Sequence, residues 1–122
     1  MTFVTAGYYK AQLERLTQLL IALYPGSTIY QHTNPLRVPH DVLNNKVDAV
    51  LLETEMDKIN DLDFVQMLRR QKSDVPVFII SQTEDLREEA AEVGANDYLV
   101  RPVTEQQLRD AIRSVKNKEN AS

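Results

Sequence analysis

Two short runs of consecutive apolar residues constrain the fold of this chain more than any other feature. Residues 49–52 read Ala-Val-Leu-Leu, and residues 77–80 read Val-Phe-Ile-Ile. An unbroken apolar run of this length, without alternating polar residues, is typical of a strand that is buried on both faces. Such strands belong in a parallel sheet that is covered by helices on both sides.

Helical signals lie between the predicted strands. Leucines recur with helical spacing over residues 13–23, and the Pro-Gly pair at 25–26 ends that helix. Asn60 is expected to cap a second helix, whose apolar face carries Leu62, Val65 and Leu68. A further helix over residues 86–93 is expected to end at Gly94. These patterns predict helices that alternate with strands.

Weaker patterns complete the alternation. Strands are predicted at residues 2–5, 28–30 and 98–100. The segment 34–39 contains two prolines and is expected to be irregular, with a short helix following at 40–45. Thr104 and Gln107 fit a capping box that starts the last helix. The resulting order is strand–helix repeated five times, which predicts an α/β fold with a doubly wound, five-stranded parallel sheet.

The length and charge of the chain limit what it can do. With 122 residues it is expected to form one domain over residues 1–116, with 117–122 a polar tail or the start of a linker. Its 14 basic and 18 acidic residues give 14 − 18 = −4, so direct nucleic-acid binding is not expected. The absence of cysteine excludes thiol chemistry and disulfides. Without a long apolar run or a leader pattern, we expect a cytoplasmic protein with no membrane association.

In parallel sheets of this kind, functional groups lie at the carboxyl ends of the strands. The residues at those ends are predicted to be Thr5 and Ala6, Glu53, Ser81 and Arg101.

Three segments resemble the receiver domain of bacterial two-component response regulators. Residues 47–53 are similar to the strand that ends at the family's phospho-acceptor aspartate, and residues 76–81 to the strand that ends at its switch hydroxyl. Residues 94–102, Gly-Ala-Asn-Asp-Tyr-Leu-Val-Arg-Pro, resemble the stretch with the switch aromatic and Lys-Pro. The resemblance implies a CheY-like, flavodoxin-like (βα)5 fold with strand order 2-1-3-4-5.

The resemblance also assigns roles to residues, and the chain departs from most of them. Glu53 stands where the family has the acceptor aspartate, and Arg101 where it has lysine. The acidic pair that helps to hold Mg²⁺ matches Thr5 and Ala6, or Tyr9-Lys10 in an alternative alignment, and neither choice supplies a carboxylate. Ser81 and Tyr98 keep the switch hydroxyl and aromatic.

These departures predict a pseudo-receiver, which has the fold without standard phosphotransfer. We expect no enzyme activity, no cofactor and no bound Mg²⁺. One hypothesis is that Glu53 imitates the acyl phosphate, held by Arg101 through two parallel hydrogen bonds and completed by Ser81; the other is that Glu53 only replaces a lost site. Tyr98 is either a two-state switch or a fixed aromatic.

Two alternatives from other classes stay open. The chain could be a working receiver that is phosphorylated with Mg²⁺ on Glu53, Glu55 or Asp57, although the latter two also fit a solvated acidic loop. It could instead be a flavodoxin-like protein that binds a nucleotide or flavin, for which residues 5–7, Thr-Ala-Gly, are the only hint.

Protein partners are the expected ligands of a pseudo-receiver. The resemblance implies a homodimer or partner surface on the fourth helix, fifth strand and fifth helix, and allows an output domain linked beyond this chain. His32 and His40 are expected to be surface residues and not a metal pair.

Overall fold

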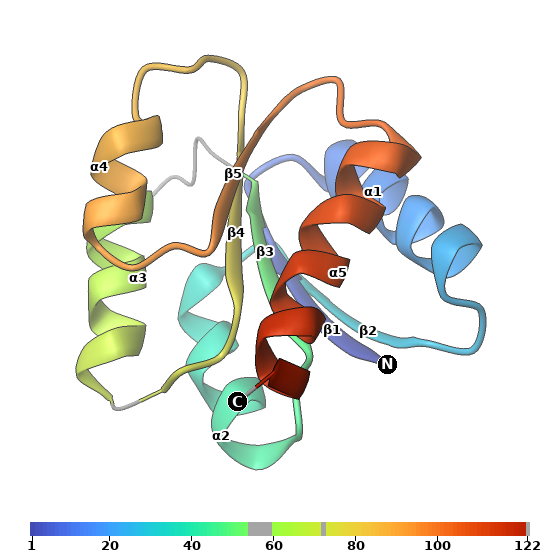
Figure 1. Cartoon of the computed structure of the whole chain (residues 1–122), viewed down its shortest axis with the longest axis horizontal. Helices are drawn as coiled ribbons and strands as arrows, with labels where there is room; N and C mark the ends of the chain where they lie inside the picture. The colour runs from blue at the N-terminus through green and yellow to red at the C-terminus, as the bar shows by residue number, and fades with distance from the viewer. Residues whose placement is uncertain (54–59, 72, 122) are drawn as a thin grey trace.

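Five strands form one parallel sheet in the computed structural model, which describes residues 1–53, 60–71 and 73–121. The strand order is β2-β1-β3-β4-β5, so the predicted doubly wound fold is confirmed (Figure 1). The elements are β1 Thr2–Ala6, α1 Lys10–Leu23, β2 Thr28–His32, the 3₁₀ turn η1 Pro35–Arg37, α2 Val38–Asn44, β3 Ala49–Glu53, α3 Asp61–Arg70, β4 Val77–Ser81, α4 Arg87–Glu92, β5 Asp97–Val100 and α5 Glu105–Ala121.

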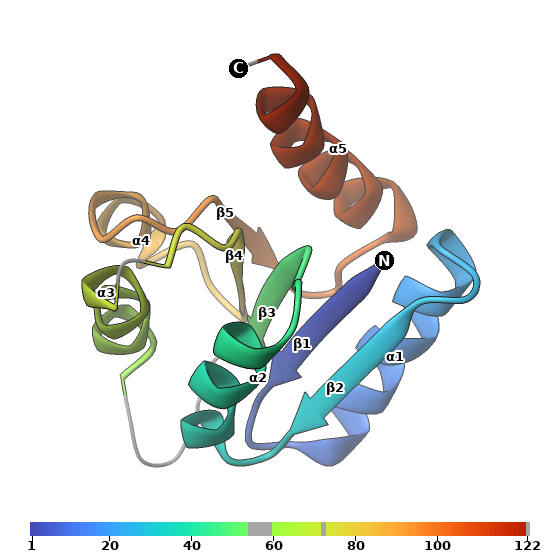
Figure 2. The same ribbon diagram turned by 90° about the horizontal axis from the view of Figure 1, so that it is seen from below.

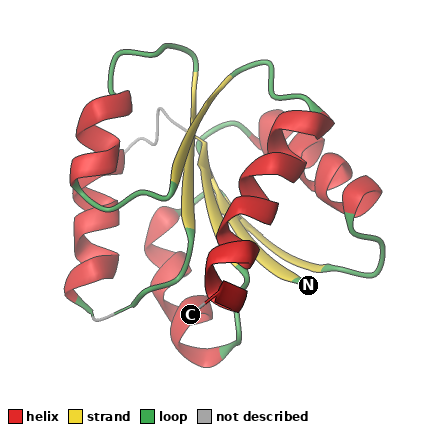
Figure 3. Ribbon diagram, viewed as in Figure 1, coloured by secondary structure: helices red, strands yellow, loops and turns green. Residues whose placement is uncertain are grey.

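The sheet separates two apolar cores, because successive side chains of each strand point to opposite faces. Helices α1 and α5 cover one face, and α2, α3 and α4 cover the other (Figures 2 and 3). In β3, Val50 and Leu52 belong to the core under α2–α4, whereas Leu51 belongs to the core under α1 and α5. All five residues of β3 and of β4 are buried, which is why both strands read as unbroken apolar runs.

The predicted helix ends are confirmed by their hydrogen bonds. Asn60 Oδ1 accepts from the backbone N–H groups of Leu62 and Asp63 at 2.8 and 3.4 Å. The Gln107 N–H donates to Thr104 Oγ1 and the Thr104 N–H donates to Gln107 Oε1, both at 3.1 Å. These reciprocal bonds make the capping box that starts α5. Gly94 ends α4 with a φ of 100°, a conformation that side chains resist.

One local expectation was wrong. The segment around Pro35 and Pro39 is regular: Pro35 opens η1, and Pro39 lies in the first turn of α2, where a missing N–H costs no helical hydrogen bond. The short helix therefore begins at Val38 and not at residue 40. At the other end of the chain, α5 continues to Ala121.

The register brings the carboxyl ends of the strands to one edge of the sheet, the upper edge in Figure 1. Ala6 pairs with both His32 and Leu52, Glu53 pairs with Ile80, and Ser81 pairs with Val100. The peptide bond between Arg101 and Pro102 is cis. In the described part of the chain, no helix is long and apolar enough to cross a membrane.

Candidate functional site

Glu53 and Arg101 form a buried ion pair at the carboxyl edge of the sheet. Glu53 is the last residue of β3, and Arg101 follows the end of β5. Arg101 Nη1 donates to Glu53 Oε2 at 2.6 Å and to Gln12 Oε1, on α1, at 3.0 Å. The predicted pairing is therefore present. Among the described contacts it joins one guanidinium nitrogen to one oxygen, whereas two parallel hydrogen bonds were expected.

The environment of Glu53 is apolar enough to oppose its negative charge. The residue is only 4% exposed. Burial raises the pKa of the Glu53 carboxyl, and the hydrogen bond and positive charge of Arg101, with the charge of Arg15, only partly offset that effect. A crevice of about 40 Å³ lies between these groups and α1. Glu53 is thus a buried carboxyl group held by the Arg101 guanidinium in a site with little room for other ligands.

Gly7 makes the closest approach to Glu53 from the neighbouring strand. It follows the end of β1, and a Cβ at this position would lie 2.7 Å from Glu53 Cβ. Thr5 and Ala6, which were matched to the family's acidic pair, are fully buried within β1 and pair with Leu51 and Leu52. The residue beside Glu53 is therefore glycine.

Ser81 and Tyr98 are both buried, but neither has a described contact with Glu53. Ser81 Oγ accepts from the Thr83 N–H at 3.2 Å, and its part in the Glu53–Arg101 contact stays a prediction. Tyr98 is 3% exposed, and its hydroxyl donates to the Thr83 carbonyl oxygen at 2.7 Å. The guanidinium carbon of Arg87 lies 5.2 Å from the centre of the Tyr98 ring. Tyr98 is thus packed inward.

Sequence reasoning missed three residues of this site. Gln12 and Arg15 come from α1, where their polar side chains look like those of any exposed helix face. Gly7 was noted only as part of a weak loop motif. Gln12 and Arg15 each precede a buried leucine, Leu13 and Leu16, by one position, and that placement along α1 is the signal that could have found them.

The two histidines differ from each other. His40 is exposed, as expected. His32 is half-buried, and its Nε2 contacts the carboxylate of Asp41, a buried residue of α2. His32 is thus partly exposed and paired with α2, whereas His40 is fully at the surface.

Glu55 and Asp57, the alternative acceptors, lie outside the described residues. Among the residues that are described, no three His, Cys, Asp or Glu side chains come together in a way that could hold a metal ion.

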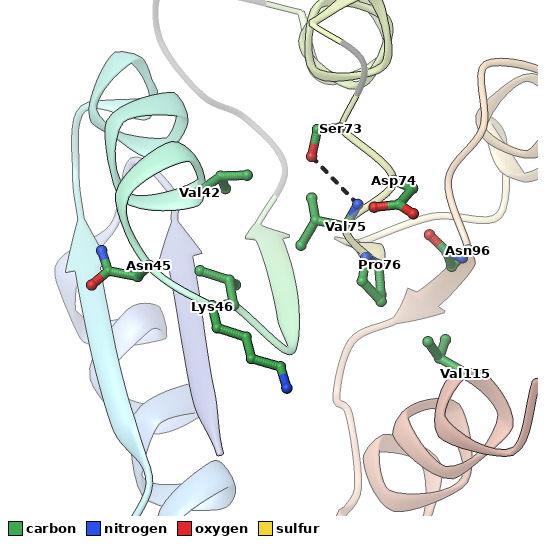
Figure 4. Close-up of a pocket in the computed structure, with 10 residues that line it drawn as sticks. Val42, Asn45, Lys46, Ser73, Asp74, Val75, Pro76, Asn96 and Val115 are labelled. Carbon is green, nitrogen blue, oxygen red and sulfur yellow. Dashed lines mark hydrogen bonds between the residues drawn. The ribbon is translucent and has the colours of Figure 1, made fainter. Parts of the chain in front are cut away.

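A larger cavity, of about 480 Å³, lies at the opposite edge of the sheet. Figure 4 shows Lys46 from the segment before β3, Asp74 and Pro76 from the segment before β4, and Val115 from α5 on its walls. This edge holds the amino ends of the strands, whereas ligands of open parallel sheets bind at the carboxyl ends. We therefore place the functional site at Glu53.

The fold and this edge of the sheet define a receiver-like module, and comparison with known proteins gives the family. The family model described as "Response regulator receiver domain" matches residues 10–113. The chain belongs to the response regulator receiver domain family, which consists of signalling modules.

Individual relatives agree with that assignment. The chain is 31% identical over 98 residues to the cyclic di-GMP phosphodiesterase response regulator RpfG of Xanthomonas campestris, covering 77% of this chain and 26% of the relative. It is 29% identical over 84 residues to the transcriptional regulatory protein CusR of Escherichia coli, covering 67% of this chain and 37% of the relative. The chain thus spans well under half the length of these two relatives.

Solved structures support the fold. A receiver domain protein of Clostridium thermocellum matches with a TM-score of 0.85 at 23% identity, covering 98% of this chain and 97% of the other. A CheY-like receiver domain protein of Methanospirillum hungatei matches with a TM-score of 0.84 at 11% identity, covering 98% and 96%.

Proposed function

We propose that this chain is an atypical receiver that regulates a partner or output domain by protein contact, without phosphorylation of Glu53. The buried ion pair between Glu53 and Arg101 carries this proposal. A phospho-acceptor must present a free carboxylate oxygen to the phosphoryl donor. Here the carboxylate is 4% exposed, and Oε2 is bound by Arg101.

The groups around Glu53 also do not fit Mg²⁺, which the family's chemistry implies. Mg²⁺ requires oxygen ligands in near-octahedral geometry. The described side chains that line the crevice with Glu53 include two guanidinium groups, those of Arg15 and Arg101, and one amide, that of Gln12. A divalent cation beside these two guanidinium cations is repelled. We therefore expect no phosphotransfer through a divalent ion at this site.

The packing of the buried Tyr98 supports the proposal that the domain has a single conformation. Its hydroxyl is bound to Thr83, and its ring is covered by Arg87. A ligand shifts a two-state equilibrium only by its differential affinity for the two states. Without a phosphoryl group to favour the other state, Tyr98 acts in this proposal as a fixed aromatic of the surface formed by α4, β5 and α5.

That surface is our candidate for the partner or homodimer contact. Exposed carboxylates gather on α4 at Glu88, Glu89 and Glu92, whereas α5 carries Arg109 and Arg113. Opposite charges on α4 and α5 suit a self-complementary contact across a two-fold axis. The greater length of the matched relatives supports an output domain outside this chain. A cytoplasmic location fits such a regulator.

The test is incubation of the protein with a small phosphoryl donor and Mg²⁺, followed by intact mass and peptide mapping. A receiver that has an acceptor aspartate, treated in the same tube, shows that the donor is active. We expect no added phosphoryl group. A phosphoryl group on Glu53 that is lost in Glu53→Gln would contradict the proposal, and one that maps to Glu55 or Asp57 would establish the working-receiver alternative.

A further inference from the structure

We propose that positions 7 and 53 form a single-occupancy site, in which the backbone leaves room for a side chain on only one of the two residues. This inference rests on the proposed function and deepens it. It states why the site is closed to a divalent cation: the two strand ends are too close to carry two carboxylates. The property lies in the backbone and not only in the identity of the side chains.

The distances at Gly7 carry the inference. The pairing of Ala6 with Leu52 places Gly7 beside Glu53 at the ends of β1 and β3. A Cβ on Gly7 would lie 2.7 Å from Glu53 Cβ and 3.4 Å from Glu53 Cγ. Carbon atoms without a bond between them settle at about 3.5–4.0 Å, so the first contact is a clash. Because it involves the Cβ of Glu53, no change of rotamer relieves it.

The loop that carries Gly7 is held on both sides. Its N–H donates to the His32 carbonyl oxygen at 3.1 Å, which ties it to β2. The same hypothetical Cβ would lie 3.4 Å from a methyl group of the buried Leu13 on α1. Because β1 lies between β2 and β3, moving Gly7 away from Glu53 would press its backbone against His32 of β2. Its φ lies outside the left-handed region, so close approach, and not backbone conformation, is what requires glycine here.

One consequence concerns the ligand class of the site. A divalent cation at this edge is bound more strongly by carboxylates from both strand ends than by a single one, since each carboxylate adds an oxygen ligand. If only one position can carry a side chain, that side chain is Glu53, and Arg101 neutralises it. Supplying a second carboxylate at position 7 then does not create a cation site.

The first experiment is a double-mutant cycle on thermal stability with the full chain. Gly7→Ala is expected to lower Tm by at least about 4 °C, the shift for a modest overpacking cost in a domain of this size. In the Glu53→Gly background, the same substitution is expected to lower Tm by less than half as much. Equal effects in both backgrounds, or a rise in Tm on Gly7→Ala, would overturn the inference. Gly26→Ala is the control, because nothing lies within 4 Å of that position and its cost, due to a φ of 85°, should not depend on residue 53.

The second experiment measures cation binding. A purely structural role of Gly7 makes no prediction about that binding. Mn²⁺ is titrated into Glu53→Asp and into Gly7→Asp/Glu53→Asp, and paramagnetic broadening of amide signals near residue 53 is followed. We expect the same weak, diffuse broadening in both. Specific broadening at residue 53 in the double variant would show that two carboxylates fit, and would overturn the inference. Phosphorylation of the wild-type protein would instead contradict the proposed function alone, so the two failures are distinguishable.

Discussion

Glu53 is a carboxylate whose burial and ion pair act in opposite directions. Burial raises the pKa of its carboxyl, and Arg101 and Arg15 only partly restore the charged form. The folded state therefore holds the Glu53 proton to a higher pH than the unfolded state does. By linkage, the contribution of this group to stability is greatest below its ordinary pKa and is lost as the pH rises through the raised value.

A comparison with Glu53→Gln tests that sign. Gln has the shape of protonated Glu and does not titrate. We expect the free energy of unfolding of wild type, minus that of the variant, to fall as the pH rises from about 4 to 7. Urea unfolding of both proteins at several pH values measures this difference in the free energy of unfolding. A difference that grows with pH would mean that the ion pair outweighs burial.

Tyr98 offers a second test at single-residue scale. Tyr98→Phe removes the hydroxyl that donates to Thr83 and leaves the ring and its contact with Arg87. We expect a loss of about 1 kcal/mol in the free energy of unfolding, the usual value of one such hydrogen bond. Tyr24→Phe, which removes a hydroxyl with no described hydrogen bond, is the matched control. Equal losses in the two variants would mean that the Thr83 contact contributes nothing.

The positions of site residues could be predicted from the sequence where an apolar run marked the end of a strand. Glu53 and Arg101 end or follow apolar runs, so their meeting at one edge could be foreseen. The Thr83 N–H that donates to Ser81, the partial burial of His32 and the approach of Gly7 to Glu53 could not be foreseen. Each depends on how a loop packs against a neighbouring strand, and periodicity carries no information about that.

At the scale of elements, Arg69 joins three segments that are distant in sequence. From the end of α3, its guanidinium donates to the carbonyl oxygens of Ser73, Val75 and Gly94 and to Asn96 Oδ1, at 2.8–3.2 Å. This fork ties α3 to the starts of β4 and β5. A single ammonium group cannot reach all of these acceptors.

Arg69→Lys is therefore expected to cost about 2 kcal/mol, because half-buried carbonyl groups lose their donors. Arg70→Lys, next along α3 and exposed, should change the free energy of unfolding by less than about 0.5 kcal/mol. Urea denaturation of both variants measures this contrast. Equal losses in the free energy of unfolding would show that the hydrogen bonds of the Arg69 guanidinium contribute no more than an exposed charge does.

The helices show where element-level prediction holds. Asn60, Gly94 and the Thr104–Gln107 box set helix ends that the structure confirms, because each has its own hydrogen-bonding mechanism. Pro35 and Pro39 led to a wrong prediction of an irregular segment, since proline is compatible with the first turn of a helix as well as with a loop.

At the scale of the whole molecule, the fold and family follow from two buried strands and the alternation around them. Membership in the receiver family fixes the topology and the position of the functional edge. It does not fix the chemistry at that edge, since function depends on the site and not on the fold. Glycine beside glutamate, with arginine across from both, is a different site on the same scaffold.

The most direct test of a closed phospho-site is an amide NMR titration of the wild-type chain with Mg²⁺ and beryllofluoride, which stands in for the phosphoryl group. We expect no specific shifts at Glu53, Ser81 or Arg101, and none at Tyr98. Saturable shifts of all four amides together would show that the site still binds a phosphoryl-like ligand and drives a switch, which contradicts a receiver that works without phosphorylation.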